Sequence, residues 1–184
     1  QGLVFGLLIA PLVYFIFLGP ARDRFGLLSL ANNREIIDKV YTLRKESPSL
    51  VIKYFINKPF MVTGEWLMNY LRPFSTEFLF VRGDPVMRHS IQVVGQLLPL
   101  TAPFLLIGLY VLAKKRQWLW FVWLALAPIP ASMTSDGGYH ATRLFLMVPP
   151  LAVFIGTGLS IIKNRLLISI IYFLISLQLI WIGY

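Results

Sequence analysis

The chain has 184 residues, of which 57% are hydrophobic and 14% are charged, and its formal net charge is +9. A soluble domain cannot bury this share of apolar side chains, so the composition predicts an integral protein of the cell membrane whose basic loops contact lipid headgroups. Cysteine is absent, which excludes disulfides and thiolate metal sites. No basic aromatic patch stands apart from the apolar segments, which argues against nucleic acid as a partner.

Five apolar stretches approach the roughly 20 residues that a helix needs to cross a bilayer. They are residues 2–18, 97–113, 118–133, 144–162 and 166–184. The first stretch also resembles the core of a signal peptide, but its lack of a basic start favours a membrane helix. The sequence therefore predicts an all-α, multi-pass membrane protein. Because residue 1 is not Met and both ends lie in apolar runs, we expect a single membrane region that belongs to a larger parent chain.

Basic residues set the predicted orientation of these spans. Residues 114–116 (KKR) join the second and third spans, and residues 163–165 (KNR) join the fourth and fifth. The short loop on the opposite side carries only Arg143. Since short basic loops stay in the cytoplasm, residues 19–96 are predicted to form an extracytoplasmic loop.

The long loop shows helical patterns. Asn32 or Asn33 is expected to cap a helix with an apolar stripe, and Glu35 stands three residues after Asn32, as in a capping box. The predicted stripe consists of Ile36, Ile37, Val40 and Tyr41, and Pro48 is expected to end this helix. A second short helix is predicted over 49–58, stopped by Pro59. Two arrangements remain open: helices lying along the membrane surface, or a small packed domain beside it.

A third helix of the loop is predicted to begin at Thr63 or Gly64 and to end before Pro73. Beyond it lies the first polar segment, residues 82–89 (RGDPVMRH). One interpretation is structural, with Arg82 and Asp84 pairing across a glycine. The other is functional, with Arg88 and His89 donating hydrogen bonds to a phosphate.

The second polar segment, residues 135–143 (SDGGYHATR), lies between two apolar stretches. Its charged side chains are costly near a bilayer and therefore point to a function. The glycine pair predicts a sharp turn, and His140 and Arg143 share a face if a helix begins near Tyr139. Arg143 has two interpretations: its head reaches for the membrane interface, or it contacts an anionic ligand.

Small and helix-breaking residues follow this segment. The proline pair at 149–150 predicts an interrupted helix, which is a pointer to a polar site inside a membrane protein. Gly156, Gly158 and Ser160 further along predict close contact with another helix.

Three stretches resemble, in the same order, a family of bacterial membrane glycosyltransferases. They are FLFVRGDPVMRHSIQVVGQL at 78–97, APIPASM at 127–133 and DGGYHATRLFLMVPP at 136–150. These enzymes resemble the dolichyl-phosphate-mannose protein mannosyltransferases and have the GT-C fold. The similarity spans about half of the chain, roughly residues 70–158. It is weak in the first span and in most of the long loop.

The resemblance implies a glycosyltransferase that moves a sugar from a polyprenyl-phosphate carrier to an acceptor on the extracytoplasmic face. In the family, the catalytic acidic residue lies in a first outer loop without a counterpart here, so no catalytic residue is assigned. The residues expected to bind the carrier phosphate or its sugar are Arg88, His89, His140 and Arg143, with support from Arg82, Asp84 and Asp136. Positive charge at these places would also stabilise the departing phosphate.

Two other classes of membrane protein remain as alternatives to a glycosyltransferase. A transporter or flippase of lipid-linked or envelope substrates is the main alternative, although charges here gather at the membrane boundary rather than at its midplane. A non-catalytic assembly or polymerase-like protein is the third. The two histidines and scattered carboxylates lack metal-ligand spacing, so no metal or resident cofactor is expected, and a divalent ion held together with other segments stays open.

Overall fold

The computed structural model describes residues 14, 26–47, 49, 53, 55–88, 90 and 92–183. These residues form helices, turns and loops, and among them one antiparallel bridge joins Ser29 and Thr134. The predicted all-α class is therefore confirmed. The chain divides into an N-terminal unit, Gln1–Leu67 with Met133–Ser135, and a C-terminal unit, Met68–Ser132 with Asp136–Tyr184.

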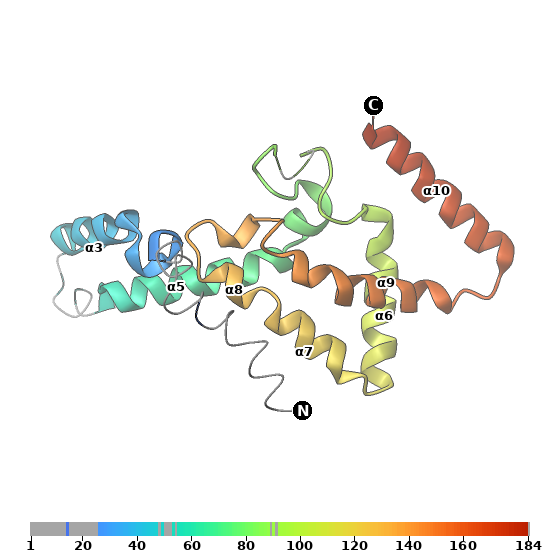
Figure 1. The fold of residues 1–184 in the computed structure, drawn as a ribbon, viewed down its shortest axis with the longest axis horizontal. Helices are drawn as coiled ribbons and strands as arrows, with labels where there is room; N and C mark the ends of the chain where they lie inside the picture. The colour runs from blue at the N-terminus through green and yellow to red at the C-terminus, as the bar shows by residue number, and fades with distance from the viewer. Residues whose placement is uncertain are drawn as a thin grey trace. The chain divides into compact units, whose positions relative to one another are not determined.

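The main helix of the N-terminal unit is α3, Arg34–Glu46, which follows the short turn η1, Leu30–Asn32 (Figure 1). Asn33 caps it, because its side-chain oxygen accepts a hydrogen bond of 2.8 Å from the backbone N–H of Glu35. The predicted helix is confirmed, with Asn33 as the capping residue. Its apolar stripe is only partly covered: Ile36 and Val40 are buried, whereas Tyr41 is 75% exposed.

Helix α5, Lys58–Leu71, contributes residues to both units. Asn57 stands before it and accepts a hydrogen bond from the backbone N–H of Phe60. Pro59 lies in the first turn, where its missing N–H costs no hydrogen bond. The predictions that Pro59 stops a helix and that the next one begins at Thr63 or Gly64 are therefore wrong. The predicted end before Pro73 is confirmed. Residues 50–52 and 54 of the short helix predicted over 49–58 lie outside the described residues.

The C-terminal unit carries the remaining elements. They are η2 (Arg72–Phe74), η3 (Glu77–Val81), η4 (Pro99–Thr101), α6 (Ala102–Lys114), α7 (Trp118–Leu126), α8 (Ile129–Ser132), η5 (Gly137–Tyr139), η6 (Phe145–Met147), α9 (Val148–Ser160) and α10 (Arg165–Gly183). η3 is a π-helix, in which the N–H of Arg82 donates to the carbonyl of Glu77. An exposed turn, residues 115–117, connects α6 to α7, and Arg116 there has a φ of 55°.

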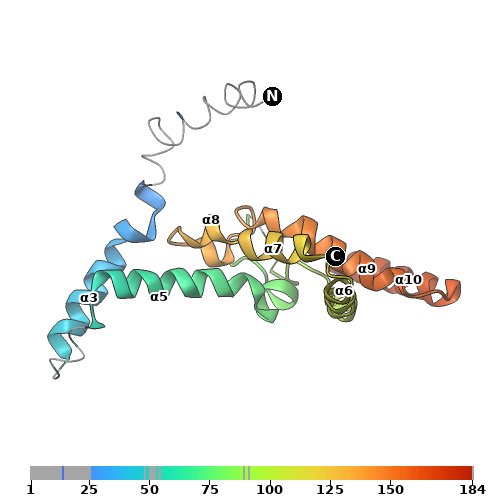
Figure 2. The same cartoon turned by 90° about the horizontal axis from the view of Figure 1, so that it is seen from below.

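Helices α6 and α9 cross each other at close range, as both ribbon views show (Figures 1 and 2). Two glycines make this possible. A Cβ at Gly108 would lie 1.7 Å from the carbonyl oxygen of Phe154, and one at Gly158 would lie 2.0 Å from that of Phe104. The backbones can approach only because both side chains are absent. The predicted contact is thus confirmed for Gly158, whereas a Cβ at Gly156 would meet nothing within 4 Å.

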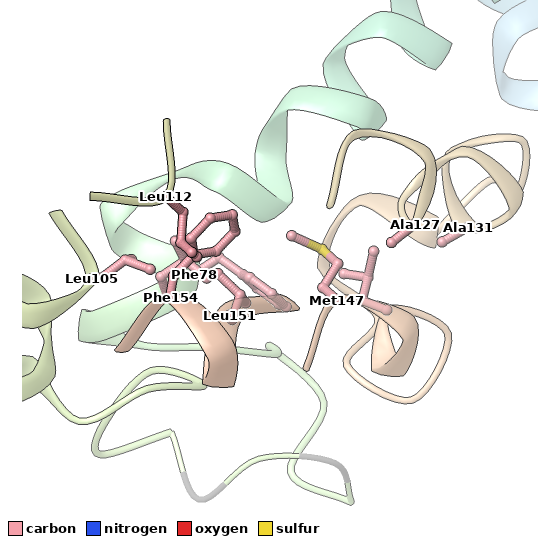
Figure 3. Packing of buried hydrophobic residues seen from close by; sticks show 10 residues of the cluster. Phe78, Leu105, Leu112, Ala127, Ala131, Met147, Leu151 and Phe154 are labelled. Carbon is pink, nitrogen blue, oxygen red and sulfur yellow. The ribbon is translucent and has the colours of Figure 1, made fainter. Parts of the chain in front are cut away.

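A hydrophobic core gathers around this crossing. Phe78, Leu105, Leu112, Leu151 and Phe154 form its centre, and Figure 3 shows Met147 nearer to Ala127 and Ala131. Phe78 belongs to the π-helix η3, which directly precedes the first polar segment. The core therefore holds η3 in place. The ring of Phe121 packs edge-on against Phe154 at 5.0 Å between centroids. Core residues therefore flank both polar segments in the chain, since Phe78 precedes the first and Leu144 follows the second.

The proline pair lies at the start of a helix rather than within one. α9 begins at Val148, so Pro149 and Pro150 occupy its first turn, where no intrahelical N–H bond is lost. The predicted interruption of a helix by these prolines is therefore wrong. The apolar stretch 118–133 is also irregular near its end, because α7 stops at Leu126 and a turn through Pro128 precedes α8.

The lengths of the apolar helices differ. Among the described residues, one helix is long and apolar enough to cross a membrane: the 18 residues Arg165–Ile182 have a mean hydropathy of 2.1, and 6% of them are buried. The apolar helices Pro99–Lys114, Trp118–Ser132 and Phe145–Ser160 are shorter. They coincide with three predicted spans, and membrane insertion stays a prediction. The first predicted span, 2–18, lies outside the described residues except for Tyr14.

Candidate functional site

The carboxylate of Asp84 joins the two polar segments. Its side chain is 1% exposed. One oxygen accepts a hydrogen bond of 2.8 Å from the N–H of Val86, within the first polar segment, and the other accepts one of 2.8 Å from the N–H of Ala141, 57 residues away in the second. A buried carboxylate needs such donors, because without them its charge would be costly. Asp84 therefore links the two segments directly.

The two charged residues at the ends of the second segment pair with each other. Arg143 forms an ion pair with Asp136, and the Arg143 side chain is only 25% exposed. His140 lies within reach of Thr142, with 2.9 Å between its Nδ1 and the threonine Oγ1. The segment is a succession of tight turns, since the N–H of Arg143 donates to the carbonyl of His140. The predicted helix start near Tyr139 is wrong, because α9 begins only at Val148.

The second segment rests on the chain that follows α5. Gly138 lies so close to it that a Cβ would approach the Cδ of Arg72 to 2.8 Å and the Oδ1 of Asn69 to 2.9 Å. Arg72 donates a hydrogen bond of 2.8 Å to Asn69, which is itself buried, and its guanidinium stands 5.5 Å from the ring centre of Tyr139. The predicted sharp turn at the glycine pair is confirmed as η5. Gly138 is needed there for close approach.

The first segment presents its arginines to solvent. Arg82 forms an ion pair with Glu77 at 3.5 Å, and the two side chains are 76% and 56% exposed. Gly83 has a φ of 73°, a left-handed conformation that favours glycine. Arg88 is exposed, whereas His89 lies outside the described residues. Convergence of Arg88 and His89 with His140 and Arg143 on one pocket therefore stays a prediction.

A cleft of about 480 Å³ borders both segments. Among the described residues it is lined by Glu77, Arg82, Gly83, Asp84, Pro85, Gln92 and Tyr139. Two of the predicted supporting residues, Arg82 and Asp84, are thus brought together here. Arg88, His140 and Arg143 are not part of this described lining, although Tyr139 and Ala141 flank His140 in the chain.

Reasoning from the sequence missed Glu77 and Tyr139. Glu77 precedes the aromatic run at 78–80, and its role follows from the π-helix, whose wider turn leaves its side chain beside that of Arg82. Tyr139 lies inside a segment that the sequence marks, and only the contact with Arg72 shows that its ring is held in place.

Within the described part of the chain, no group of three or more histidines and carboxylates is placed to hold a metal ion. Comparison with known proteins found no matching family model, no matching curated protein and no matching solved structure.

Proposed function

We propose that this chain is part of a membrane glycosyltransferase of the GT-C type, which transfers a sugar from a polyprenyl-phosphate carrier to an acceptor outside the membrane. One observation carries the proposal. The two polar segments that bear the resemblance are far apart in sequence, and Asp84 joins them directly. A buried carboxylate that bridges two partly exposed loops favours a shared site over two unrelated turns.

The residues at this junction suit a lipid phosphate. Arg143 and His140 belong to the turns that Asp84 holds, and Arg88 follows Asp84 in the first segment. Guanidinium and imidazolium groups donate charge-assisted hydrogen bonds to phosphate oxygens. The ion pair with Asp136 holds the Arg143 side chain in place, so less rotamer freedom is lost when a ligand binds.

The proposed reaction assigns these groups a binding role. Positive charge beside the carrier phosphate would stabilise the charge that develops as the sugar leaves. Exposed apolar side chains on the nearby helices, such as Leu146 on η6 and Trp123 on α7, suit the prenyl chain and the surrounding lipid.

The test uses the full-length parent protein with a polyprenyl-phosphate sugar donor. Arg143→Lys keeps the charge but loses the planar fork, so we expect kcat/KM to fall about tenfold or more, the equivalent of one charge-assisted hydrogen bond. Arg165→Lys, exposed at the start of α10, is the matched control and should leave the rate unchanged.

Two outcomes would count against the proposal. Near-normal rates in both Arg143→Lys and Arg143→Ala would remove the phosphate role of Arg143. Movement of the donor across proteoliposome membranes without sugar transfer would identify a transporter or flippase.

A further inference from the structure

We propose that the cleft between η3 and the second polar segment binds the sugar carried by the lipid phosphate. This inference rests on the proposed function and adds the place of the sugar to it. The cleft is distinct from the arginines expected to hold the phosphate, because its described lining includes Arg82 but neither Arg88 nor Arg143.

The charges in the cleft favour an uncharged ligand over an anion. Glu77 and Asp84 are the acidic residues among the described lining residues, and Arg82 is the one basic residue there. A phosphate placed here would meet more negative than positive charge. A neutral polyol suits such a surface, since its hydroxyls can donate to the exposed carboxylate of Glu77 and accept from the guanidinium of Arg82.

The exposed ion pair in the cleft supplies both kinds of partner. Glu77 and Arg82 lie 3.5 Å apart with side chains 56% and 76% exposed, so neighbouring hydroxyls of a sugar can reach them. Hydrogen bonds to charged groups are stronger than those between neutral groups. An exposed pair of this kind contributes little to stability, which makes a structural reason for it weak.

The ring of Tyr139 adds an aromatic wall. It lines the cleft and is fixed by the guanidinium of Arg72 at 5.5 Å and by the ring of Phe78 at 6.0 Å between centroids. Aromatic rings interact weakly but favourably with polarised C–H groups such as those of a pyranose. The cleft volume of about 480 Å³ lies within the range of small-molecule sites and accommodates a monosaccharide with bound water.

Asp84 places this cleft next to the proposed phosphate site. Asp84 is one of the lining residues, and its carboxylate accepts the hydrogen bond from Ala141, the neighbour of His140. A sugar in the cleft would therefore lie near the turn that carries His140 and Arg143. This is the arrangement that a sugar phosphate requires, with the neutral ring and the anion in adjacent environments.

The experiment compares two ligands on the full-length parent in lipid nanodiscs. The probes are polyprenyl phosphate and the same carrier loaded with a hexose, and the quantity of interest is the ratio of their Kd values. In Glu77→Gln we expect the affinity for the loaded carrier to fall about tenfold relative to that for the bare carrier. This corresponds to the loss of one charge-assisted hydrogen bond. The Kd of the bare carrier should stay within about twofold.

Two further variants complete the design. Arg82→Gln should act like Glu77→Gln, and both are expected to fold because the two side chains are exposed. Glu46→Gln, the same substitution on the exposed end of α3, is the control and should change neither Kd. An unchanged ratio in both cleft variants, or an equal loss for bare and loaded carrier, would overturn the sugar subsite.

A second arm separates this inference from the proposed function. If the wild-type parent binds no polyprenyl phosphate, the proposed function fails, and saturation-transfer NMR with free hexoses then tests the cleft alone. Signals that are lost in Glu77→Gln but kept in Glu46→Gln would support the cleft as a sugar site. Signals that are absent from wild type, or equal in both variants, would refute it.

Discussion

At the scale of single residues, the buried carboxylate of Asp84 matters most for the connection between the two polar segments. Removing an anion from water is expensive unless hydrogen bonds replace its hydration, and two backbone N–H groups do so here. The backbone at Val86 and Ala141 cannot move away from Asp84 without disrupting the turns that contain these residues. The carboxylate therefore connects the backbones of the two polar segments. The side chains next to Ala141 are positioned by this connection.

Asp84→Asn should destabilise the protein although it keeps the shape of the side chain. An amide offers one accepting oxygen, and its NH₂ group would face an N–H donor, so one buried hydrogen bond is lost. We expect the free energy of unfolding to fall by about 1–3 kcal/mol, measured by denaturant titration in detergent. Asp136→Asn, whose pair is more exposed, should cost less than about 1 kcal/mol. Equal losses for the two variants would contradict the role of Asp84.

At the scale of elements, the crossing of α6 and α9 depends on two glycines that fit each other's backbone. Neither contact involves a flexible side chain that could move aside, because a Cβ at either position would strike a carbonyl oxygen. The two helices would have to separate along their whole contact to accept one methyl group. That separation would open the core around Phe154, which is fully buried.

Gly108→Ala and Gly158→Ala should each lower the free energy of unfolding by at least about 1–3 kcal/mol, the usual cost of overpacking. Gly156→Ala is a matched control on the same helix, where a Cβ meets nothing within 4 Å. It should be neutral or stabilising by up to about 1 kcal/mol, because alanine is the better helix former. Thermal unfolding of the three variants in one detergent provides the comparison, and equal behaviour would argue against the close crossing.

The sequence predicts elements well where the signal is local. The capping asparagine and the apolar stripe locate α3, and the glycines locate one contact of α9. Prolines mislead, because the same residue stops one helix and starts another. Pro59 and Pro149 both proved to lie in first turns, and the better signal for α5 is the capping residue Asn57.

At the scale of the whole molecule, the site depends on contacts that no local pattern contains. The hydrogen bond from Ala141 to Asp84 joins residues 57 apart in the sequence, and the close approach of Gly138 to Asn69 joins residues 69 apart. The sequence marks both polar segments as unusual because charge is costly in an apolar chain. It does not reveal which side chain faces which, because that depends on how the helices between them pack.

The predicted orientation can be tested on the whole protein because the chain contains no cysteine. Single cysteines at Met87, Asp136, Lys115 and Lys163 occupy exposed positions. In intact cells, an impermeant thiol reagent should label positions 87 and 136 and should reach 115 and 163 only after permeabilisation. Labelling of position 115 from outside would reverse the orientation.

The exposed turn at 115–117 has a consequence for the continuity of the chain. Asp84 and Gly108 precede this turn, and their partners Ala141 and Phe154 follow it. Both contacts therefore join the two sides of the turn without involving the turn residues. A polypeptide cut at this turn would still have a buried helix crossing and a bridging carboxylate to hold its halves. We therefore expect the segments before and after residues 115–117 to stay associated when the chain is cut at this turn.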